Sequence, residues 1–263
     1  MQKKTSLGTY LSRAGVCSRR KADTLVRDGQ VMLNGTIVRE PGWEVKANDV
    51  VMYQGRKIQP ENKVYILLNK PTDYLSAVSD DDRERQTVID LVKKACSERL
   101  YPIGRLDYRT TGLIILTNDG DLAQRLAHPS FEVTKIYRAE LNVAFKQSDL
   151  NRVKGGLLLD DGPMMVDEIY FDKNSPDKRH VIVSIHSGKK RVVRRLFQHI
   201  GYRVLQLDRI EYAGLTKQGL RVGQWRLLKE HEVSQLKHLG KAIRVGSGNY
   251  SRQSLQDFQS LAD

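Results

Sequence analysis

The carboxylate of Asp107 has a sequence setting that suits catalysis. It belongs to the run Gly104-Arg105-Leu106-Asp107, shortly before the apolar stretch Leu113 to Leu116. A side chain in a turn at the start of a buried strand can enter a cleft, because loops carried by rigid strands commonly hold functional groups. Asp107 can then serve as a nucleophile or as a base, with Arg105 close to it. The alternative is an aspartate that only caps the backbone of its turn.

Two further segments carry side chains that can contribute to such chemistry. In Lys135-Ile136-Tyr137 the tyrosine lies in an alternating strand pattern, from which its ring can stack on a base and its hydroxyl can reach a substrate atom. Residues 188–197 have apolar positions at helical spacing, and the same helix carries the three arginines Arg191, Arg194 and Arg195. A half-buried strand tyrosine and a solvated basic helix face are the alternatives.

Metal-dependent and hydrolytic chemistry is not indicated by the sequence. The six histidines are scattered, and the two cysteines, Cys17 and Cys96, form no metal-binding or disulfide pattern. Of the acidic runs, Asp160-Asp161-Gly162 is typical of a turn between strands and Asp80-Asp81-Asp82 of a solvated loop. We therefore expect no metal site and no cofactor, and a nuclease or hydrolase is disfavoured.

The positive charge of the chain points to a polyanionic partner. The sequence holds 44 Lys and Arg against 31 Asp and Glu, a net charge of +13, and residues 1–63 alone hold 12 basic and 6 acidic side chains. Nucleic acid is the simplest partner for such a balance. No apolar run reaches the roughly 18 residues of a membrane-spanning helix, and the charged start is not followed by an apolar segment. We therefore expect a soluble cytoplasmic protein with no membrane association.

The first sixty residues contain the signals of two helices and two strand pairs. Apolar residues from Leu7 to Ala14 have helical spacing, and Ser18 can cap a second helix that ends at Gly29. Asn34-Gly35 between apolar runs predicts a hairpin, and Gln54-Gly55 a second strand pair. Residues 59–63, which include a proline, are expected to be a linker.

The rest of the chain mixes strands and helices without regular alternation. Strands are expected at residues 64–68, 113–116, 135–143 and 180–187, and helices at 121–127, 148–154, 190–200 and 230–239. A doubly wound parallel sheet is therefore disfavoured, and an α+β domain with a mixed, mainly antiparallel sheet fits better. We expect domains at residues 1–60 and 61–239, with 240–263 as a polar, mobile tail.

The motifs around Asp107 resemble those of a known enzyme family. The run Gly104 to Asp119 resembles the signature of the bacterial ribosomal RNA pseudouridine synthases that modify single sites in small- or large-subunit RNA. Glu132 to Tyr137 follows at the family's distance, and Gly188 to Phe197 is similar to its third motif. The resemblance implies a bent central sheet and an isomerase that detaches uracil from ribose, turns it and rejoins it through carbon, without a redox step or cofactor.

The same resemblance implies roles for individual residues. Asp107 would be the catalytic carboxylate, Tyr137 would lie against the base, and Arg194 would pair with Asp107 and stabilise its negative charge. Arg105 would help to displace the target base from its helix, with a phosphate contact as the alternative. Arg191 and Arg195 are expected to bind RNA.

Two positions depart from the family pattern. Val192 stands where the family usually has glutamine, and Asp73 where it usually has glycine. Asn69-Lys70-Pro71 resembles a weaker first motif, from which Lys70 is expected to contact RNA. A strand that simply ends before a turn proline is the alternative for this segment.

Residues 6–60 resemble the small RNA-binding domain shared with ribosomal protein S4. The similarity rests on Ser18 to Asp23 and Gly29 to Gly35. It implies that RNA phosphates are bound near the start of the second helix, where backbone N–H groups and the helix dipole add to the basic side chains. The RNA-binding residues expected here are Arg13, Arg19, Arg20, Lys21 and Arg27.

We therefore expect an enzyme that isomerises a uridine in structured ribosomal RNA, acts as a monomer and needs no nucleotide cofactor. The Glu132-Val133 stretch and the short tail favour a large-subunit over a small-subunit target. The hypothesis from a different class is a non-catalytic RNA-binding or ribosome-assembly factor on the same scaffold. Loss of Asp107, Tyr137 or Arg194 would favour that factor, but all three are present.

Overall fold

The protein is described from a computed structural model, which defines residues 5–79 and 85–239. The chain forms two compact units. The small unit comprises Met1–Val64 with Ala95–Leu100 and Thr117–Gly120, and the large unit comprises the remaining segments. The expected tail at 240–263 and the acidic run at 80–82 lie outside the described residues.

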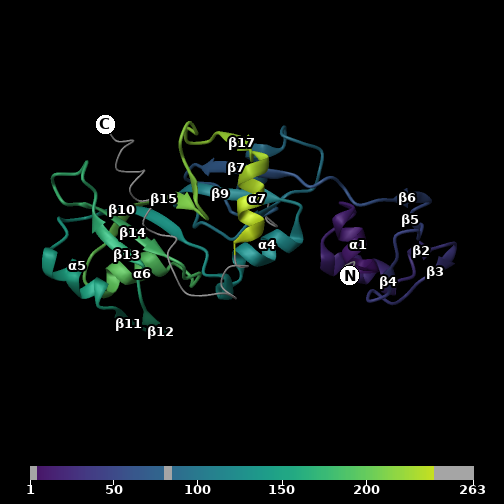
Figure 1. Cartoon of the computed structure of the whole chain (residues 1–263), viewed down its shortest axis with the longest axis horizontal. Helices are drawn as coiled ribbons and strands as arrows, with labels where there is room; N and C mark the ends of the chain where they lie inside the picture. The colour runs from purple at the N-terminus through teal and green to yellow at the C-terminus, as the bar shows by residue number, and fades with distance from the viewer. Residues whose placement is uncertain (1–4, 80–84, 240–263) are drawn as a thin grey trace. The chain divides into compact units, whose positions relative to one another are not determined.

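The small unit packs two short helices against a four-stranded antiparallel sheet with the strand order β3-β2-β5-β6 (Figure 1). A short strand pair, β1 with β4, accompanies them. The elements are β1 (Thr5–Ser6), α1 (Leu7–Arg13), α2 (Arg19–Arg27), β2 (Val31–Leu33), β3 (Thr36–Ile37), β4 (Glu44–Val45), β5 (Val51–Tyr53) and β6 (Arg56–Ile58). Their core is built from Leu7, Leu11, Ala22, Val26, Val31 and Val51, all fully buried.

The expected capping and turn residues act as the sequence indicates. The Ser18 side chain accepts a hydrogen bond from the backbone N–H of Lys21 at 3.4 Å, which caps α2. Asn34 and Gly35 both have positive φ, 52° and 84°, as a two-residue hairpin turn requires. The expected linker is anchored inside the small unit, because the Glu61 backbone N–H donates to the Arg13 carbonyl and Lys63 pairs with Asp119 at 2.9 Å.

The large unit is built on a nine-stranded mixed sheet with the order β13-β14-β10-β15-β9-β7-β17, in which β16 pairs with β15 and β8 with β9. Strand β15 pairs in parallel with β9, whereas β10–β14, β10–β15, β13–β14, β15–β16 and β7–β17 are antiparallel pairs. The mixed, mainly antiparallel α+β fold is therefore confirmed. The strands are β7 (Tyr65–Lys70), β8 (Tyr101–Ile103), β9 (Thr111–Thr117), β10 (Lys135–Leu141), β13 (Glu168–Phe171), β14 (His180–Ile185), β15 (Val204–Tyr212), β16 (Leu215–Thr216) and β17 (Trp225–Leu227).

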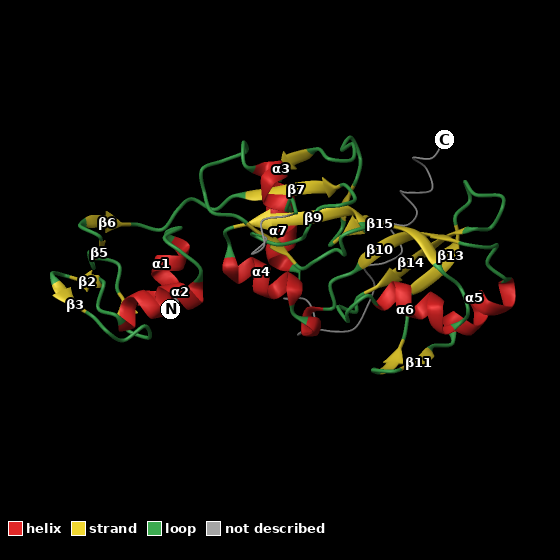
Figure 2. Ribbon diagram, turned by 180° about the vertical axis from the view of Figure 1, so that it is seen from behind, coloured by secondary structure: helices red, strands yellow, loops and turns green. Residues whose placement is uncertain are grey.

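Helices cover the two halves of this sheet. In Figure 1, α4 (Gly120–Ala127) and α7 (Glu230–His238) lie by β7 and β9, whereas α5 (Gln147–Lys154) and α6 (Val192–His199) lie by β10, β13 and β14. Figure 2 gives the same grouping from behind. The remaining elements are α3 (Val88–Val92), the 3-10 turn Pro129–Phe131, and a separate hairpin of β11 (Leu157–Leu159) and β12 (Gly162–Met164). In the parts of the chain defined above, no helix is both long and apolar enough to cross a bilayer.

Two irregular backbone features lie where chemistry is expected. The β10–β15 ladder changes register between Ile136 and Tyr137, so Ile136 pairs with Glu211 but Tyr137 with Arg209. A bulge of this kind re-aims the side chains beside it. The helix expected over residues 190–200 begins only at Val192, because Arg191 has a left-handed backbone, φ 50°, outside the helix.

Candidate active site

The loop between β8 and β9 presents Asp107. It starts at Gly104, whose φ of 70° favours glycine, and the Thr110 N–H closes a turn on the Asp107 carbonyl at 3.0 Å. The Ser76 hydroxyl donates to the Leu106 carbonyl at 3.0 Å and accepts from the Leu106 N–H at 3.1 Å. The Asp107 side chain is one-third exposed, so its carboxylate reaches the solvent side of a firmly held loop.

Lys70 is part of the support of this loop, and the expectation that it contacts RNA is wrong. Its side chain is fully buried, and its ammonium donates to the carbonyls of Pro71 (2.9 Å), Asp107 (3.3 Å), Tyr108 (3.1 Å) and Thr110 (2.9 Å). Burial lowers the pKa of Lys70 to about 8, against the smaller opposing effects of nearby carboxylates. Lys70 therefore positions the Asp107 loop from inside the fold.

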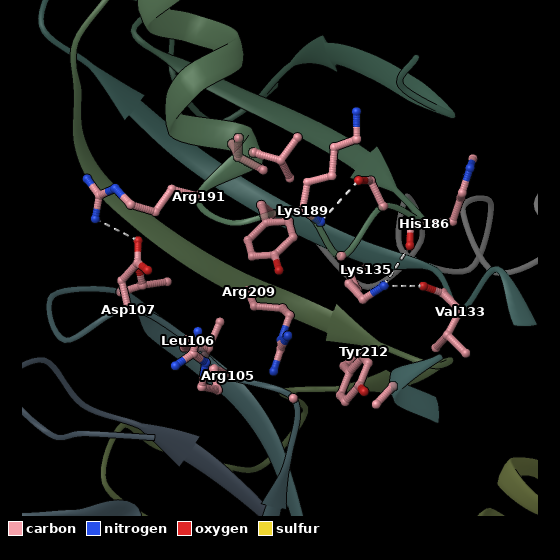
Figure 3. A pocket seen from close by; sticks show the side chains of 18 of the residues that line it. Arg105, Leu106, Asp107, Val133, Lys135, His186, Lys189, Arg191, Arg209 and Tyr212 are labelled. Carbon is pink, nitrogen blue, oxygen red and sulfur yellow. Dashed lines mark hydrogen bonds and ion pairs between the residues drawn. The ribbon is translucent and has the colours of Figure 1, made fainter. Parts of the chain in front are cut away.

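Two arginines of the third motif approach the Asp107 carboxylate. Arg191 Nη1 donates to Asp107 Oδ2 at 3.0 Å, and Arg194 Nε lies 3.7 Å from the same oxygen (Figure 3 draws the Arg191 contact). Arg194 is 15% exposed and its Nη1 donates to the Val204 carbonyl at 2.9 Å. Burial lowers the pKa of Arg194, as does Arg191, whereas Asp107 opposes this shift. The left-handed backbone at Arg191 directs that side chain to Asp107, which the helical pattern did not predict.

Asp107 lines a cleft of about 170 Å³ within the large unit. Tyr137 lines it from β10 and is largely buried. Arg105, exposed, lies on its edge, and Val192, buried at the start of α6, also contributes to its wall. The structure thus brings together Asp107, Tyr137, Arg191 and Arg105 around one cavity.

Three cations that line the cleft were not predicted as site residues: Lys135, Arg209 and Lys189, the last of which pairs with Asp161 at 3.5 Å. Lys135 donates to the carbonyls of Val133 and His186, both at 2.8 Å, and its pKa is lowered to about 8 by burial and by the charge of Arg209. Arg209 is 2% exposed, donates from Nε to the Leu113 carbonyl at 2.7 Å and lies 4.3 Å over the Tyr212 ring. The sequence gives no clear signal for Arg209, because the charged residues Asp208 and Glu211 stand beside it in the same strand.

Other expected RNA-binding residues have different settings. Arg195 donates to Asp161 Oδ2 at 2.7 Å and to the Lys190 carbonyl, which ties α6 to the β11–β12 hairpin. In the small unit, Arg19, Arg20, Lys21 and Arg27 are exposed on α2, whereas Arg13 is half-buried and donates to the Thr5 hydroxyl at 3.2 Å. Asp73, at the departure from the family's glycine, has φ 64°, a conformation that aspartate tolerates better than most residues.

Comparison with known proteins decides the family. The pattern of the RNA pseudouridylate synthase family matches residues 64–199, and that of the S4 domain matches residues 7–51. The chain belongs to the RNA pseudouridylate synthase family. It is a pseudouridine synthase with an N-terminal S4 domain, as the motifs around Asp107 and Ser18 predict.

Curated relatives agree with this assignment. The synthase is 40% identical to ribosomal large subunit pseudouridine synthase B of Bacillus subtilis, over 89% of this chain and 96% of the relative. It is 33% identical to the dual-specificity RNA pseudouridine synthase RluF of Escherichia coli, over 88% of this chain and 77% of the relative. A crystal structure of a pseudouridylate synthase shares its fold, with a TM-score of 0.62 over 88% of this chain and 99% of the other, at 24% identity.

Proposed function

We propose that this synthase converts one uridine of ribosomal RNA, in the large subunit, to pseudouridine, with Asp107 as the catalytic carboxylate and no cofactor. The observation that carries the catalytic part is the position of Asp107, on a braced loop at a cation-lined cleft and paired with Arg191. The ribosomal target is supported by the 40% identity to a relative named for the large subunit.

Asp107 acts on the ribose side of the reaction. Its carboxylate either bonds to C1′ of the target ribose or takes the proton of the 2′ carbon, and in both cases it must be ionised. Arg191 and Arg194 both approach the same carboxylate oxygen of Asp107, so two positive charges lie beside the reacting group. Tyr137 supports the base by stacking, and Arg105 at the cleft edge fills the space that a displaced base leaves in its helix.

The S4 unit binds the surrounding RNA. Arg19, Arg20 and Lys21 occupy the first turn of α2, which contains no acidic residue. Positive side chains near the positive end of the helix dipole do not stabilise the helix. Three of them in the first turn are therefore better explained by the binding of an anionic ligand. Phosphate contacts from this turn hold a structured RNA while the large unit acts on a single nucleotide.

Pseudouridine mapping tests the substrate. Ribosomal RNA from cells that lack this gene should have lost pseudouridine at one position of the large subunit, and a copy of the wild-type gene should restore it. Loss of a small-subunit position instead would overturn the large-subunit target. If all ribosomal positions persist in the deletion strain, the proposed enzyme function fails and a non-catalytic RNA-binding factor becomes the better hypothesis.

A further inference from the structure

Arg209, which is buried, and Lys135, which is half-buried, are two cations that face one cleft without a carboxylate partner. Both line the cavity, and neither forms an ion pair within residues 5–79 and 85–239. Arg209 Nη2 is buried and has no hydrogen-bond partner in that part of the chain. The carboxylate that acts on Lys135 from a distance, Asp167, is already bonded to His186 at 2.6 Å.

Two such cations close together are unfavourable unless a bound ligand supplies negative charge. Burial without a counter-charge disfavours each cation, and their like charges repel, which is also why Arg209 contributes to the lowered pKa of Lys135. Removing a pairing carboxylate from buried cations costs several kcal/mol in typical proteins, so folds rarely keep them without a reason. The cleft is therefore prepared for negative charge on a bound group.

The position of the pair points to the base. Arg209 is the register partner of Tyr137 across the β10–β15 ladder, and Lys135 lies two residues before Tyr137 on the same face of β10. Both cations are thus neighbours of the ring proposed to stack on uracil. Figure 3 shows Lys135, Arg209 and Tyr212 grouped apart from Asp107 and Arg191. An RNA phosphate belongs to a continuous backbone that follows the protein surface, whereas Arg209 is only 2% exposed and Lys135 is half-buried.

Base detachment creates negative charge at that place. When the C1′–N1 bond breaks, its electron pair stays with uracil, which becomes an anion with charge shared by N1, O2 and O4. Asp107 compensates the ribose by bonding to C1′ or by accepting the 2′-carbon proton. After rotation, the C5–C1′ bond forms as the Asp107–C1′ bond breaks or, in the second route, as the proton returns from Asp107 to C2′. The C5 proton then leaves and N1 takes up a proton, so the atoms of substrate and product are the same.

We propose that Lys135 and Arg209 contact the carbonyl oxygens of the target uracil and stabilise the anion that forms while the base is detached from its ribose. This inference rests on the proposed function. The cations are fixed before the reaction by their bonds to the backbone carbonyls of Val133, His186 and Leu113. Fixed charges at the place where charge develops are the most effective form of electrostatic catalysis.

The test compares uridine with 5-fluorouridine at the target position of the RNA fragment that contains it. Fluorine withdraws electrons and stabilises the departing anion, so a lost protein cation matters less. Lys135→Met should lower the single-turnover consumption of the target uridine about 100-fold, the usual effect of losing one such donor, with RNA affinity unchanged within about threefold. The defect should shrink at least about tenfold with 5-fluorouridine, and Lys135→Arg should keep most of the activity.

Matched variants separate the possible failures. Lys146→Met removes the same charge from an exposed position at the start of α5 and should leave the rate unchanged. Arg209→Lys keeps a positive charge but changes its position. If Lys135→Met does not fold, the rates of Arg209→Lys on the uridine and 5-fluorouridine RNAs are compared instead. Equal defects on both RNAs would overturn the proposal, as would a loss of RNA affinity that points to a phosphate contact. If the wild type converts neither RNA, the proposed function itself has failed.

Discussion

At the scale of single residues, the position of Lys70 in the structure differs from the one that its sequence motif predicts. The sequence places this lysine beside a turn proline in a motif of the family, and a basic residue there was expected to contact RNA. Its ammonium instead binds four carbonyls under the Asp107 loop. A basic side chain in a sequence cannot be assigned to the surface or to the interior without knowing which backbone groups lie around it.

Replacing Lys70 should weaken both the fold and the active-site loop. Lys70→Met keeps the length of the side chain but leaves the carbonyls of Asp107, Tyr108 and Thr110 without this donor, and we expect a loss of about 2–4 kcal/mol in the free energy of unfolding. Urea unfolding of the variant and of Lys146→Met, an exposed control, measures it. A loss below about 0.5 kcal/mol would contradict the positioning role.

The pH dependence of this difference has a defined sign. Burial lowers the pKa of Lys70 from its usual 10.5 to about 8, so between these values the unfolded chain holds a proton that the folded protein has released. In the wild type, Lys70 therefore makes the free energy of unfolding rise with pH in this window. Lys70→Met lacks this titrating group, so its free energy of unfolding lacks this increase. The gap between the two proteins should widen from pH 8 to pH 10.

At the scale of elements, the parallel contact between β9 and β15 depends on Gly112. Its φ is 112°, and a Cβ atom there would lie 2.3 Å from the Arg209 carbonyl oxygen and 2.4 Å from the Arg209 nitrogen. The close approach brings the strand that follows Asp107 against the strand that carries Arg209. Gly112 therefore allows the backbones of β9 and β15 to lie close together beside the cleft.

Gly112→Ala should be strongly destabilising. Since backbone atoms must move to admit the methyl group, we expect the free energy of unfolding to fall by about 3 kcal/mol or more. Gly42→Ala is the control, because a Cβ atom at Gly42 has open space around it. Thermal unfolding of both variants measures the difference. A Gly112→Ala protein as stable as the control would contradict the prediction, because it would show that β9 and β15 can move apart at no cost in stability.

Elements that depend on local signals were predictable from the sequence. The Ser18 cap, the Asn34-Gly35 turn and the helices α4, α5 and α7 lie at or within one residue of their expected bounds. Strand β15 was not predicted, although it joins β10 to β9 in the middle of the sheet. Its alternation of polar and apolar residues is interrupted by the bulge opposite Tyr137, and a parallel pairing with a distant strand leaves no local sequence signal.

At the scale of the whole molecule, the chain combines an RNA-binding unit with a catalytic unit. The sequence predicts both, because each has short motifs with a physical meaning: cations at a helix start, and one aspartate before a strand. It did not identify Lys135 and Arg209 as site residues. Their burial and their shared cleft arise from strand register and from the order of strands in the sheet, which single residues do not encode.

The central claim is that Asp107 carries the chemistry of this synthase. We would measure tritium release from target RNA labelled at C5 of uridine, together with RNA affinity, for the wild type, Asp107→Asn and the exposed control Asp160→Asn. Asp107→Asn should release tritium at least roughly a thousandfold more slowly while binding RNA within about threefold of the wild type, and Asp160→Asn should match the wild type. Release by Asp107→Asn within about tenfold of the wild-type rate would contradict the assignment of Asp107.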